Sequence, residues 1–469
     1  MKPVGSRRSF FLFLSLIGLT GMGPAEASFD LSGPPLDVRV TRNGETLPIA
    51  QVPNLEAGDR LWLHPDFPRE QSARYLLVAV FLRGSTNPPP DSWFSHAQTW
   101  SRDVREEGIT VTVPPDAQQA IVFLAPETNG DFSTLRTNVR AKPGAFVRAS
   151  QDLNQASLDR SRLDAYVGAV TQVSQADPEA LKQASKLLAR SLNIKVDSDC
   201  FQKPPDQQLA CLTQNQDQMV LDDGHTQSMV AALTSGASAD LIGQLSATPM
   251  AGAGAYSPYV GAIVDVVRIM DGIHTAQFQY IPALVQPRQD QLLLKLNNPP
   301  SFINPKSVLT VGLPAIGEPQ LPPLRAVDPE QVYCAERPSL LLPVDGAPLV
   351  YSTGLGHDFV LHIQGKNGEA IDLPARPEPQ RGGFVVDTHT VQLASMNPEV
   401  TGVLRGRWGF QPFDGPSFHL ESAHPASWSL PEADRSALIV GRQDTLHLEA
   451  AGAACVEDVS VKEEQGRIV

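Results

Sequence analysis

Residues 221–285 determine how the chain is divided: LDDGHTQSMVAALTSGASADLIGQLSATPMAGAGAYSPYVGAIVDVVRIMDGIHTAQFQYIPALV. This stretch is the most apolar part of the chain after the first 27 residues, and it lies between two regions patterned as β-structure. Apolar residues recur at helical spacing from Val260 to Met270. Ser257 and Pro258 form a start signal, because a hydroxyl caps the first turn and proline needs no N–H partner at the first helical position. The stretch therefore predicts a buried helix in a helical domain.

The small residues of this stretch also suit contact with a membrane. Charged residues interrupt every long apolar window, however: Asp240, Asp265, Arg268 and Asp271. Because charges inside a bilayer are costly, a helix buried in a soluble domain is the favoured interpretation. Peripheral membrane association through this stretch is the weaker hypothesis.

Two more helices are expected just before this stretch. Apolar residues at helical spacing predict one helix over residues 151–175. Asp177 then offers a cap and Pro178 the first position of a second helix, which runs to Leu192. Together with the central stretch they predict an α-helical domain over residues 149–296.

β-patterning dominates on both sides of the helical domain. Continuous apolar runs at residues 75–82 and 120–126 are typical of strands buried on both faces, and residues 28–148 are expected to form a β-sandwich-like domain. Residues 297–333 are expected to form a Pro-rich linker with a first strand. Short strands at spacings near ten residues then predict one or two Ig-like β domains over residues 334–469. The predicted fold class is multidomain α+β.

The first 27 residues have the pattern of an export signal. Basic residues precede a short apolar core at residues 10–17, and Ala25 and Ala27 offer a cleavage site before Ser28. The core is too short to span a bilayer. Ser6–Leu12 resembles, in part, a twin-arginine export signal, so Sec and twin-arginine export both stay open. We expect an exported protein, periplasmic or extracellular.

The net charge argues against two classes of partner. The chain has 37 Lys+Arg and 51 Asp+Glu, a formal charge of −14, and removal of residues 1–27 leaves 34 and 50, a formal −16. Such a chain has no long-range attraction for nucleic acid or anionic lipid. We therefore expect no nucleic-acid partner. The charged residues that interrupt the central apolar stretch predict no transmembrane span in the mature chain.

Four cysteines follow the export signal, and an even number in an exported chain predicts disulfides. Cys200 and Cys211 bracket a polar turn and are expected to pair locally. Cys334 and Cys455 then remain as a pair that ties the start of the C-terminal region to its end. Structural disulfides are favoured over a metal site, because no C-x-x-C spacing occurs.

Catalytic and cofactor motifs are absent from the sequence. It contains no G-x-S-x-G, no H-E-x-x-H, no phosphate-binding loop, and no G-x-G-x-x-G after a strand. We therefore expect no cofactor. An enzyme is still compatible with this absence, because paired carboxylates leave no local signature.

One polar cluster lies beside the most apolar segment. Asp222, Asp223 and His225 place two carboxylates and an imidazole in one turn, which suits a hard cation or acid and base groups. A helix cap at Asp223 or Thr226 explains the same residues and is favoured. The cluster is nevertheless the candidate metal site, and the candidate site of a hydrolase.

Two histidine–aspartate pairs in the C-terminal region are weaker. Asp358 and His362 lie about 13 Å apart along one strand, which is too far for a shared metal. Asp387 and His389 are close enough to be ligands but lack a third partner.

Cations and aromatics alternate in the stretch RGRWGFQPFDGPSFHL, residues 405–420. Guanidinium groups and aromatic rings side by side suit recognition of anionic or sugar surfaces. Alternate residues of a strand pointing into a core and its rim explain the same pattern and are favoured. The binding candidates are Arg405, Arg407, Trp408, Phe410 and Phe413.

Four aromatic residues of the N-terminal region form a second candidate for sugar binding. Exposed together, Trp62, Trp93, Phe94 and Trp100 would stack on sugar rings, whereas aromatics in a domain of this size more often fill the core.

The leading hypothesis is an exported non-catalytic binding or structural protein of the bacterial cell envelope or secretome, which recognises protein or glycan surfaces. The alternative is an exported hydrolase whose site lies where the helical domain meets a β-domain.

Overall fold

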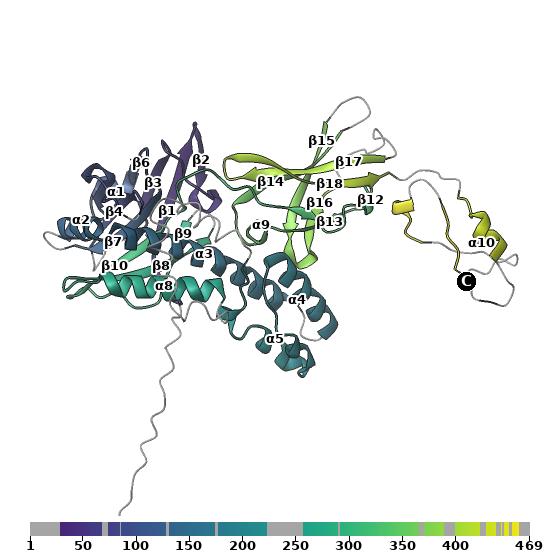
Figure 1. The fold of residues 1–469 in the computed structure, drawn as a ribbon, viewed down its shortest axis with the longest axis horizontal. Helices are drawn as coiled ribbons and strands as arrows, with labels where there is room; N and C mark the ends of the chain where they lie inside the picture. The colour runs from purple at the N-terminus through teal and green to yellow at the C-terminus, as the bar shows by residue number, and fades with distance from the viewer. Residues whose placement is uncertain are drawn as a thin grey trace, which may run out of the picture.

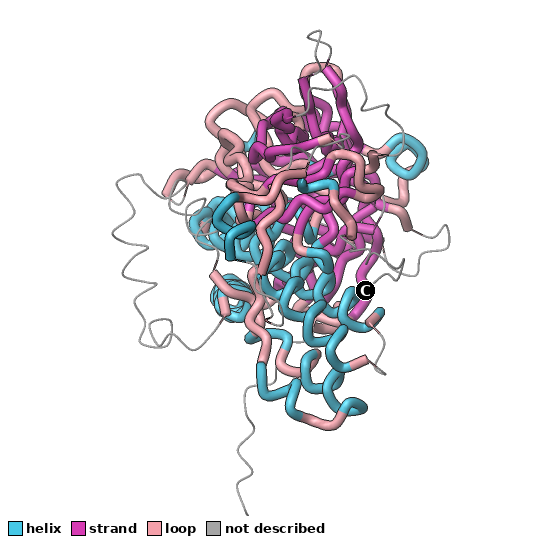
Figure 2. The backbone as a smooth tube through the Cα atoms, turned by 90° about the vertical axis from the view of Figure 1, so that its right-hand side faces the viewer, coloured by secondary structure: helices cyan, strands magenta, loops and turns pink. Residues whose placement is uncertain are grey.

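The computed structural model describes residues 29–67, 74–84, 86–127, 131–173, 177–222, 257–288, 291–364, 370–388, 399–422, 428–437, 442, 445–449 and 453–458. The fold is mixed α+β and contains two curled sheets, with a group of helices packed between and beneath them (Figure 1). Figure 2 shows that most helical segments gather on one side of the strands. The predicted export signal lies outside the described ranges.

The first sheet has ten strands in the order β5-β4-β7-β10-β8-β9-β1-β3-β6, with β2 attached to β1. Its strands are β1 (Leu31–Arg42), β2 (Glu45–Pro48), β3 (Arg60–Pro65), β4 (Tyr75–Leu82), β5 (Phe94–Gln98), β6 (Ile109–Thr112), β7 (Gln119–Pro126), β8 (Phe278–Arg288), β9 (Gln291–Leu296) and β10 (Lys306–Gly312).

The three late strands of this sheet differ from the prediction. Residues 278–296 were expected in the helical domain, but β8 and β9 belong to the first sheet, as does β10, which was expected as the first strand of the Pro-rich linker segment, residues 297–333. β10 lies between β7 and β8, antiparallel to the first and parallel to the second. Local patterns do not encode such pairing, because the partners are far apart in sequence.

The first sheet curls so that its two halves face one another across a core. Apolar residues of β1, β3 and β6 pack there against those of β4, β7 and β10. The opposite face of β4 and β7 packs in a second core, against helices. Every residue of both strands is therefore buried, which confirms the prediction of strands buried on both faces. The finer prediction of a β-sandwich-like domain stays a prediction.

The helices are α1 (Arg102–Glu107), α2 (Asp131–Ala141), α3 (Pro143–Gln172), α4 (Pro178–Leu192), α5 (Pro205–Leu212), α8 (Pro258–Ile273), α9 (Pro348–Ser352) and α10 (Glu432–Ala437). The predicted caps of α4 and α8 are confirmed: the Asp177 side chain accepts from the backbone N–H of Ala180, and Ser257 accepts from that of Val260. α3 begins earlier than predicted, with Pro143 in its first turn. It packs closely on β10, because a Cβ added at Gly312 would lie 2.3 Å from the Ser150 oxygen.

The second sheet has eight strands in the order β11-β13-β16-β15-β14-β17-β18-β12. They are β11 (Arg325–Ala326), β12 (Val332–Cys334), β13 (Leu340–Asp345), β14 (Gly356–Gln364), β15 (Ala370–Glu378), β16 (Gly383–Val386), β17 (Glu399–Trp408) and β18 (Gln411–Glu421). The prediction of Ig-like domains in this region stays a prediction.

The helices connect the two sheets through one continuous core. Buried residues of β4, β7, α3, α4, α8 and the second sheet belong to the same apolar cluster. Polar contacts reinforce the contact of α4 with the second sheet: Arg190 binds the Asp345 carboxylate at 3.0 Å and the Gly382 oxygen at 3.1 Å. The second sheet is therefore fixed to the helices through an extensive packed contact.

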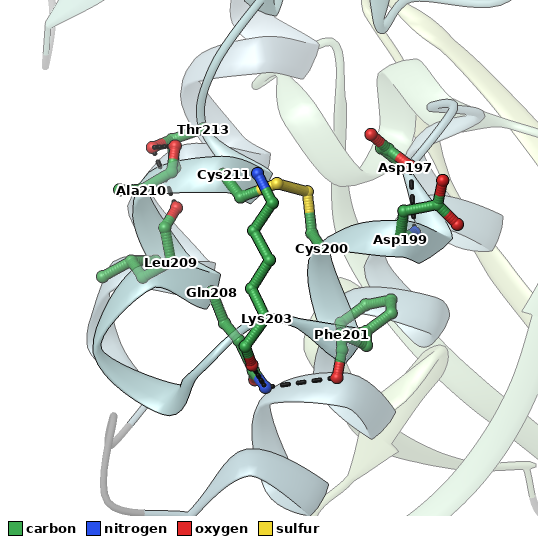
Figure 3. Close-up of a disulfide and its surroundings, with 10 residues drawn as sticks. All are labelled: Asp197, Asp199, Cys200, Phe201, Lys203, Gln208, Leu209, Ala210, Cys211 and Thr213. Atoms are coloured by element: carbon green, nitrogen blue, oxygen red, sulfur yellow. Dashed lines mark hydrogen bonds between the residues drawn. A yellow bond between two sulfur atoms is a disulfide. The ribbon is translucent and has the colours of Figure 1, made fainter.

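Both predicted disulfides are confirmed. Cys200–Cys211 joins a 3-10 turn, Ser198–Gln202, to α5, and Gln208 closes the same loop by donating to the Phe201 and Lys203 oxygens (Figure 3). Cys334–Cys455 joins β12 to the C-terminal segment. That segment leaves β18 after Glu421 and returns to it, since the Ala454 N–H donates to the Glu421 carboxylate.

Removal of the Cys334–Cys455 disulfide is expected to have a limited effect on stability. A closed loop with a separation of 121 residues would contribute about 4–5 kcal/mol in the chain-entropy model. None of the described residues of 428–449 is buried, so breaking the bond also frees this segment in the folded protein. We expect Cys334→Ser with Cys455→Ser to lower the free energy of unfolding by less than about 3 kcal/mol in urea titrations. A decrease of about 4–5 kcal/mol, the full contribution of the chain-entropy model, would contradict this expectation.

Within the described ranges, no helix has the length and apolar character that are needed to cross a membrane.

Candidate binding surface

The predicted binding residues at 405–413 lie at the contact between the two sheets. Trp408 and Phe413 are buried, each only 6% exposed, so neither ring is available as an exposed stacking surface. Arg405 pairs with Asp414 on the neighbouring strand, at 3.0 Å. Phe410 packs at the edge of the first sheet's core. Of the five residues, Arg407 and Phe410 contact the chain's own N-terminal part, whereas Trp408 and Phe413 pack in the core that the second sheet shares with the helices.

Arg407 is the centre of this contact. Its guanidinium holds both carboxylate oxygens of Glu45, with Nη1–Oε1 at 2.5 Å and Nη2–Oε2 at 2.7 Å, and it also donates to the Phe410 oxygen. Arg42 of the first sheet lies over the Phe410 ring, 4.7 Å from its centroid. A forked guanidinium on a carboxylate is a strong and geometrically specific contact. The 405–413 cluster thus clamps the second sheet to the β1–β2 hairpin.

This clamp makes stability depend on pH. The hydrogen bond from Arg407 holds the pKa of Glu45 below its usual value. A lowered carboxyl pKa contributes stability above the unfolded-state value, and that contribution is lost as the pH falls through the lowered value. Both side chains are partly exposed, so we expect less than about 1 kcal/mol, reduced further by salt.

Urea titrations of the wild type and of Glu45→Gln at about pH 6 and about pH 3 measure this term. At about pH 6 the wild type should be more stable than Glu45→Gln, and this difference in the free energy of unfolding should shrink at about pH 3. The same difference in stability between wild type and variant at both pH values would contradict a stabilising contribution of the Arg407–Glu45 pair.

The predicted metal cluster is mostly outside the described residues. Asp222 is exposed, and its oxygen accepts from the Asn193 side chain at 3.3 Å. Asp223 and His225 lie outside the described ranges, so the metal site and the hydrolase hypothesis stay predictions. In the part of the chain that the structure describes, the carboxylate–thiol group with metal-like spacing is Asp197, Cys200 and Cys211, and both sulfurs are disulfide-bonded.

Asp358 and His362 each contact another residue instead of each other. His362 contacts Asp372 of the neighbouring strand at 2.6 Å, and His357 contacts Asp358 at 2.8 Å. His389, the predicted partner of Asp387, lies outside the described residues. Neither contact builds a cluster of three ligands.

Two of the best-formed cavities among the described residues are small. One, about 60 Å³, is lined by residues 49–53, by α3 and by Leu355, and lies between the two sheets. The other, about 70 Å³, is lined by Phe29, Arg160, Asp164 and Lys295. A cavity that holds benzene measures about 150 Å³, so each of these has room for a few water molecules only.

An exposed apolar tip lies between β9 and β10. Ile303 is 79% exposed and Phe302 is 47% exposed, and we call these two residues the Phe302–Ile303 tip. The Phe302 ring meets the edge of Tyr75, with 5.7 Å between centroids, and Tyr75 stacks on Phe67 at 5.5 Å. Single exposed apolar side chains are common, and this loop differs in presenting two adjacent ones on an aromatic base.

Hydrogen bonds within the loop hold the tip in place. The Ser301 N–H donates to the Ser307 hydroxyl at 2.6 Å, and the Ser307 N–H donates to the Ser301 oxygen at 2.8 Å. Gln279 of β8 donates to the same hydroxyl, and the Ser301 hydroxyl donates to the Ile303 oxygen. The loop is thus closed on itself and attached to the sheet.

A buried ion pair anchors the base of this loop. Lys306, the first residue of β10, places its ammonium 3.1 Å from the Asp131 carboxylate at the start of α2. Gln277 donates to the other carboxylate oxygen at 2.7 Å, and its backbone oxygen accepts from the Lys306 N–H. Asp131 is 1% exposed and Lys306 is 8% exposed. Buried charges persist only when paired in this way, so the position of the loop is strongly specified.

Sequence reasoning missed this tip. Pro and Asn dominate residues 297–305, NNPPSFINP, and their composition predicts a linker. The available signal was the pair of large apolar residues inside a polar, proline-rich turn, where no periodicity explains them.

The four N-terminal aromatics differ in burial: Trp93 and Phe94 are buried, while Trp62 and Trp100 are half-buried.

Comparison with known proteins adds no further constraint. No family model, no curated protein and no solved structure matches this chain.

Proposed function

We propose that this chain is an exported, non-catalytic binding or structural protein of the bacterial cell envelope or secretome, and that it recognises a protein partner through the Phe302–Ile303 tip. The observation that carries the proposal is the 79% exposure of Ile303 on a loop fixed by a buried ion pair. An exposed apolar side chain on a rigid support loses little conformational freedom on binding. Such side chains act as anchors in partner pockets.

The energetics are sufficient for specific recognition. Full burial of a large apolar side chain is worth about 1.5–3 kcal/mol, and Phe302 and Ile303 are 47% and 79% exposed, so the two tip residues together supply about 2–4 kcal/mol before the cost of association. Neighbouring contacts, such as those of the half-buried Phe67, extend the surface around the anchor. Further contacts around the tip would make up the rest of a standard interface.

A protein pocket fits the tip better than a bilayer surface. The chain has a formal charge of −14, which is repelled by anionic lipid. Stable interfacial binding of lipids needs a long apolar helix face or two anchoring signals, whereas the tip offers two side chains. A complementary pocket, in contrast, needs only one or two anchors.

Paired variants test the proposal. Phe302→Ser with Ile303→Ser should weaken retention of the mature protein on the envelope fraction of the producing cell by at least about 100-fold, if about 3 kcal/mol of burial is lost. The matched control, Val264→Ser with Leu321→Ser, removes two apolar side chains that are 45% and 49% exposed elsewhere. Control and wild type should be retained equally, and all three should unfold at the same urea concentration. Equal loss in both double variants would sink the proposal.

A further inference from the structure

One half of the first sheet presents an outer face that the long helices leave uncovered. The inward residues of β1, β3 and β6 fill the core, so their alternate residues point outward. α3 and α8 pack on the other half, against β8 and its neighbours (Figure 1). The outward row, read across the three strands by register, is Asp37, Arg39 and Thr41, then His64, Trp62 and Arg60, then Thr110 and Thr112.

Two aromatic rings on this face form one rigid unit. Trp62 and His64 stack with their planes 1° apart and 5.2 Å between centroids. The last turn of α1 fixes both rings, because the Trp62 Nε1–H donates to the Glu107 oxygen and His64 Nε2 lies 2.8 Å from the Arg105 oxygen. Gly108 permits this close approach, since a Cβ there would lie 2.8 Å from Trp62 Nε1.

The bonding of the imidazole leaves one ring atom available. A carbonyl oxygen can only accept a hydrogen bond, so His64 Nε2 carries the hydrogen and donates it to the backbone oxygen of Arg105. His64 Nδ1 then has a lone pair and no partner among the described residues. It is suited to accept a hydroxyl hydrogen of a ligand.

The charges on the face favour an anion. Arg39 lies 5.6 Å from the Trp62 ring centroid, and its nearest acid, Asp37, is 3.3 Å away. Arg60 is exposed and has no ion pair within the described ranges. Two guanidinium groups against one carboxylate give this row a positive balance on a chain with a formal charge of −14. A free guanidinium is the side chain best shaped for a carboxylate.

We propose that the outer face of β1, β3 and β6 binds a carboxylate-bearing oligosaccharide. Arg60 binds the sugar carboxylate, the Trp62 ring packs against sugar C–H groups, and His64 Nδ1 with the hydroxyls of Thr110 and Thr112 binds sugar hydroxyls. This goes beyond the proposed protein partner and uses none of the tip residues. A saccharide is favoured over an acidic peptide, because the groups beside Arg60 are hydroxyls and an aromatic surface.

The test is calorimetric titration of the mature full-length protein with tetragalacturonate, with maltotetraose as the neutral probe of equal length and tetraglutamate as the acidic peptide probe. We expect tetragalacturonate to bind at least 10-fold more tightly than either. Arg60→Gln should weaken it at least 10-fold while the urea midpoint is unchanged, and Trp62→Phe, which also loses the hydrogen bond to the Glu107 oxygen, should weaken it too. Arg376→Gln, which removes an exposed arginine of the second sheet, should bind as the wild type does.

Three results would overturn this site. They are no binding of tetragalacturonate, equal weakening by Arg60→Gln and Arg376→Gln, and equal or tighter binding of tetraglutamate. The Phe302→Ser, Ile303→Ser variant separates the two proposals. It should bind tetragalacturonate as the wild type does, whether or not it loses its protein partner.

Discussion

Arg162→Met is expected to lower the free energy of unfolding by about 3–5 kcal/mol, because it removes one partner of a buried ion pair. The Arg162 side chain is 1% exposed and lies 3.0 Å from the Asp159 carboxylate, which is equally buried. Its other nitrogens donate to the oxygens of Leu192, Asn193 and Leu221, at 2.6–3.1 Å. These carbonyls lie at the end of α4 and at the start of the central stretch, so one side chain fixes both segments to α3.

Urea unfolding of the single and double variants measures this effect. Asp159→Asn together with Arg162→Met removes both charges, and should recover more than about 1 kcal/mol of the loss. Arg160→Met is a matched control on the same helix, since that arginine is 28% exposed and pairs with Asp164 near the surface. A loss below about 1 kcal/mol for Arg162→Met would show that the network is not structural.

Lys306→Met is expected to lower the free energy of unfolding by about 3 kcal/mol and to weaken partner binding as well. The variant leaves the buried Asp131 carboxylate with the Gln277 amide but without its 3.1 Å ammonium contact. Because Lys306 follows the tip loop directly, loss of this anchor removes the fixed position of Ile303. The two effects should therefore appear together.

Lys295→Met is the control for this variant, since Lys295 lies in β9 and has no ion pair among the described residues. It should change neither stability nor retention on the envelope fraction. Lys306→Met with full retention and reduced stability would show that the tip does not depend on its anchor.

Local features of the fold were predictable from the sequence. The Asp177 and Ser257 caps follow from residue types within one helical turn. The buried strands at residues 75–82 and 119–126 follow from continuous apolar runs, and the two disulfides follow from cysteine spacing and the elimination of alternatives. Each of these depends on information that lies close together in the chain, or on a small number of possible pairings.

Long-range pairing was not predictable in the same way. β10 pairs with β7 and β8, and no local pattern ranks the possible strand orders and registers, so its membership of the first sheet was missed. The Arg407–Glu45 contact joins residues 362 positions apart. The alternation of cations and aromatics at 405–413 was visible, but the surface that it meets belongs to the chain itself.

In the candidate sites, too, the residue types were visible in the sequence, but the long-range contacts that hold them were not predictable from it. The Phe302–Ile303 tip depends on the Asp131–Lys306 pair, and the two residues are 175 positions apart. The Trp62–His64 unit depends on helix α1, more than 40 positions later, which supplies the Glu107 and Arg105 oxygens. Sequence reasoning identified Trp62 as an aromatic of interest but offered no means of predicting what surrounds it.

The central claim is that Ile303 enters a pocket of a partner protein, and site-specific crosslinking in the producing cell tests it most directly. Ile303 is replaced by a photo-reactive phenylalanine analogue, and Val264, which is 45% exposed on α8, is replaced in a parallel strain. Irradiation should yield one discrete protein adduct from position 303 and none of that mass from position 264. No adduct from position 303, or the same adducts from both positions, would contradict the account.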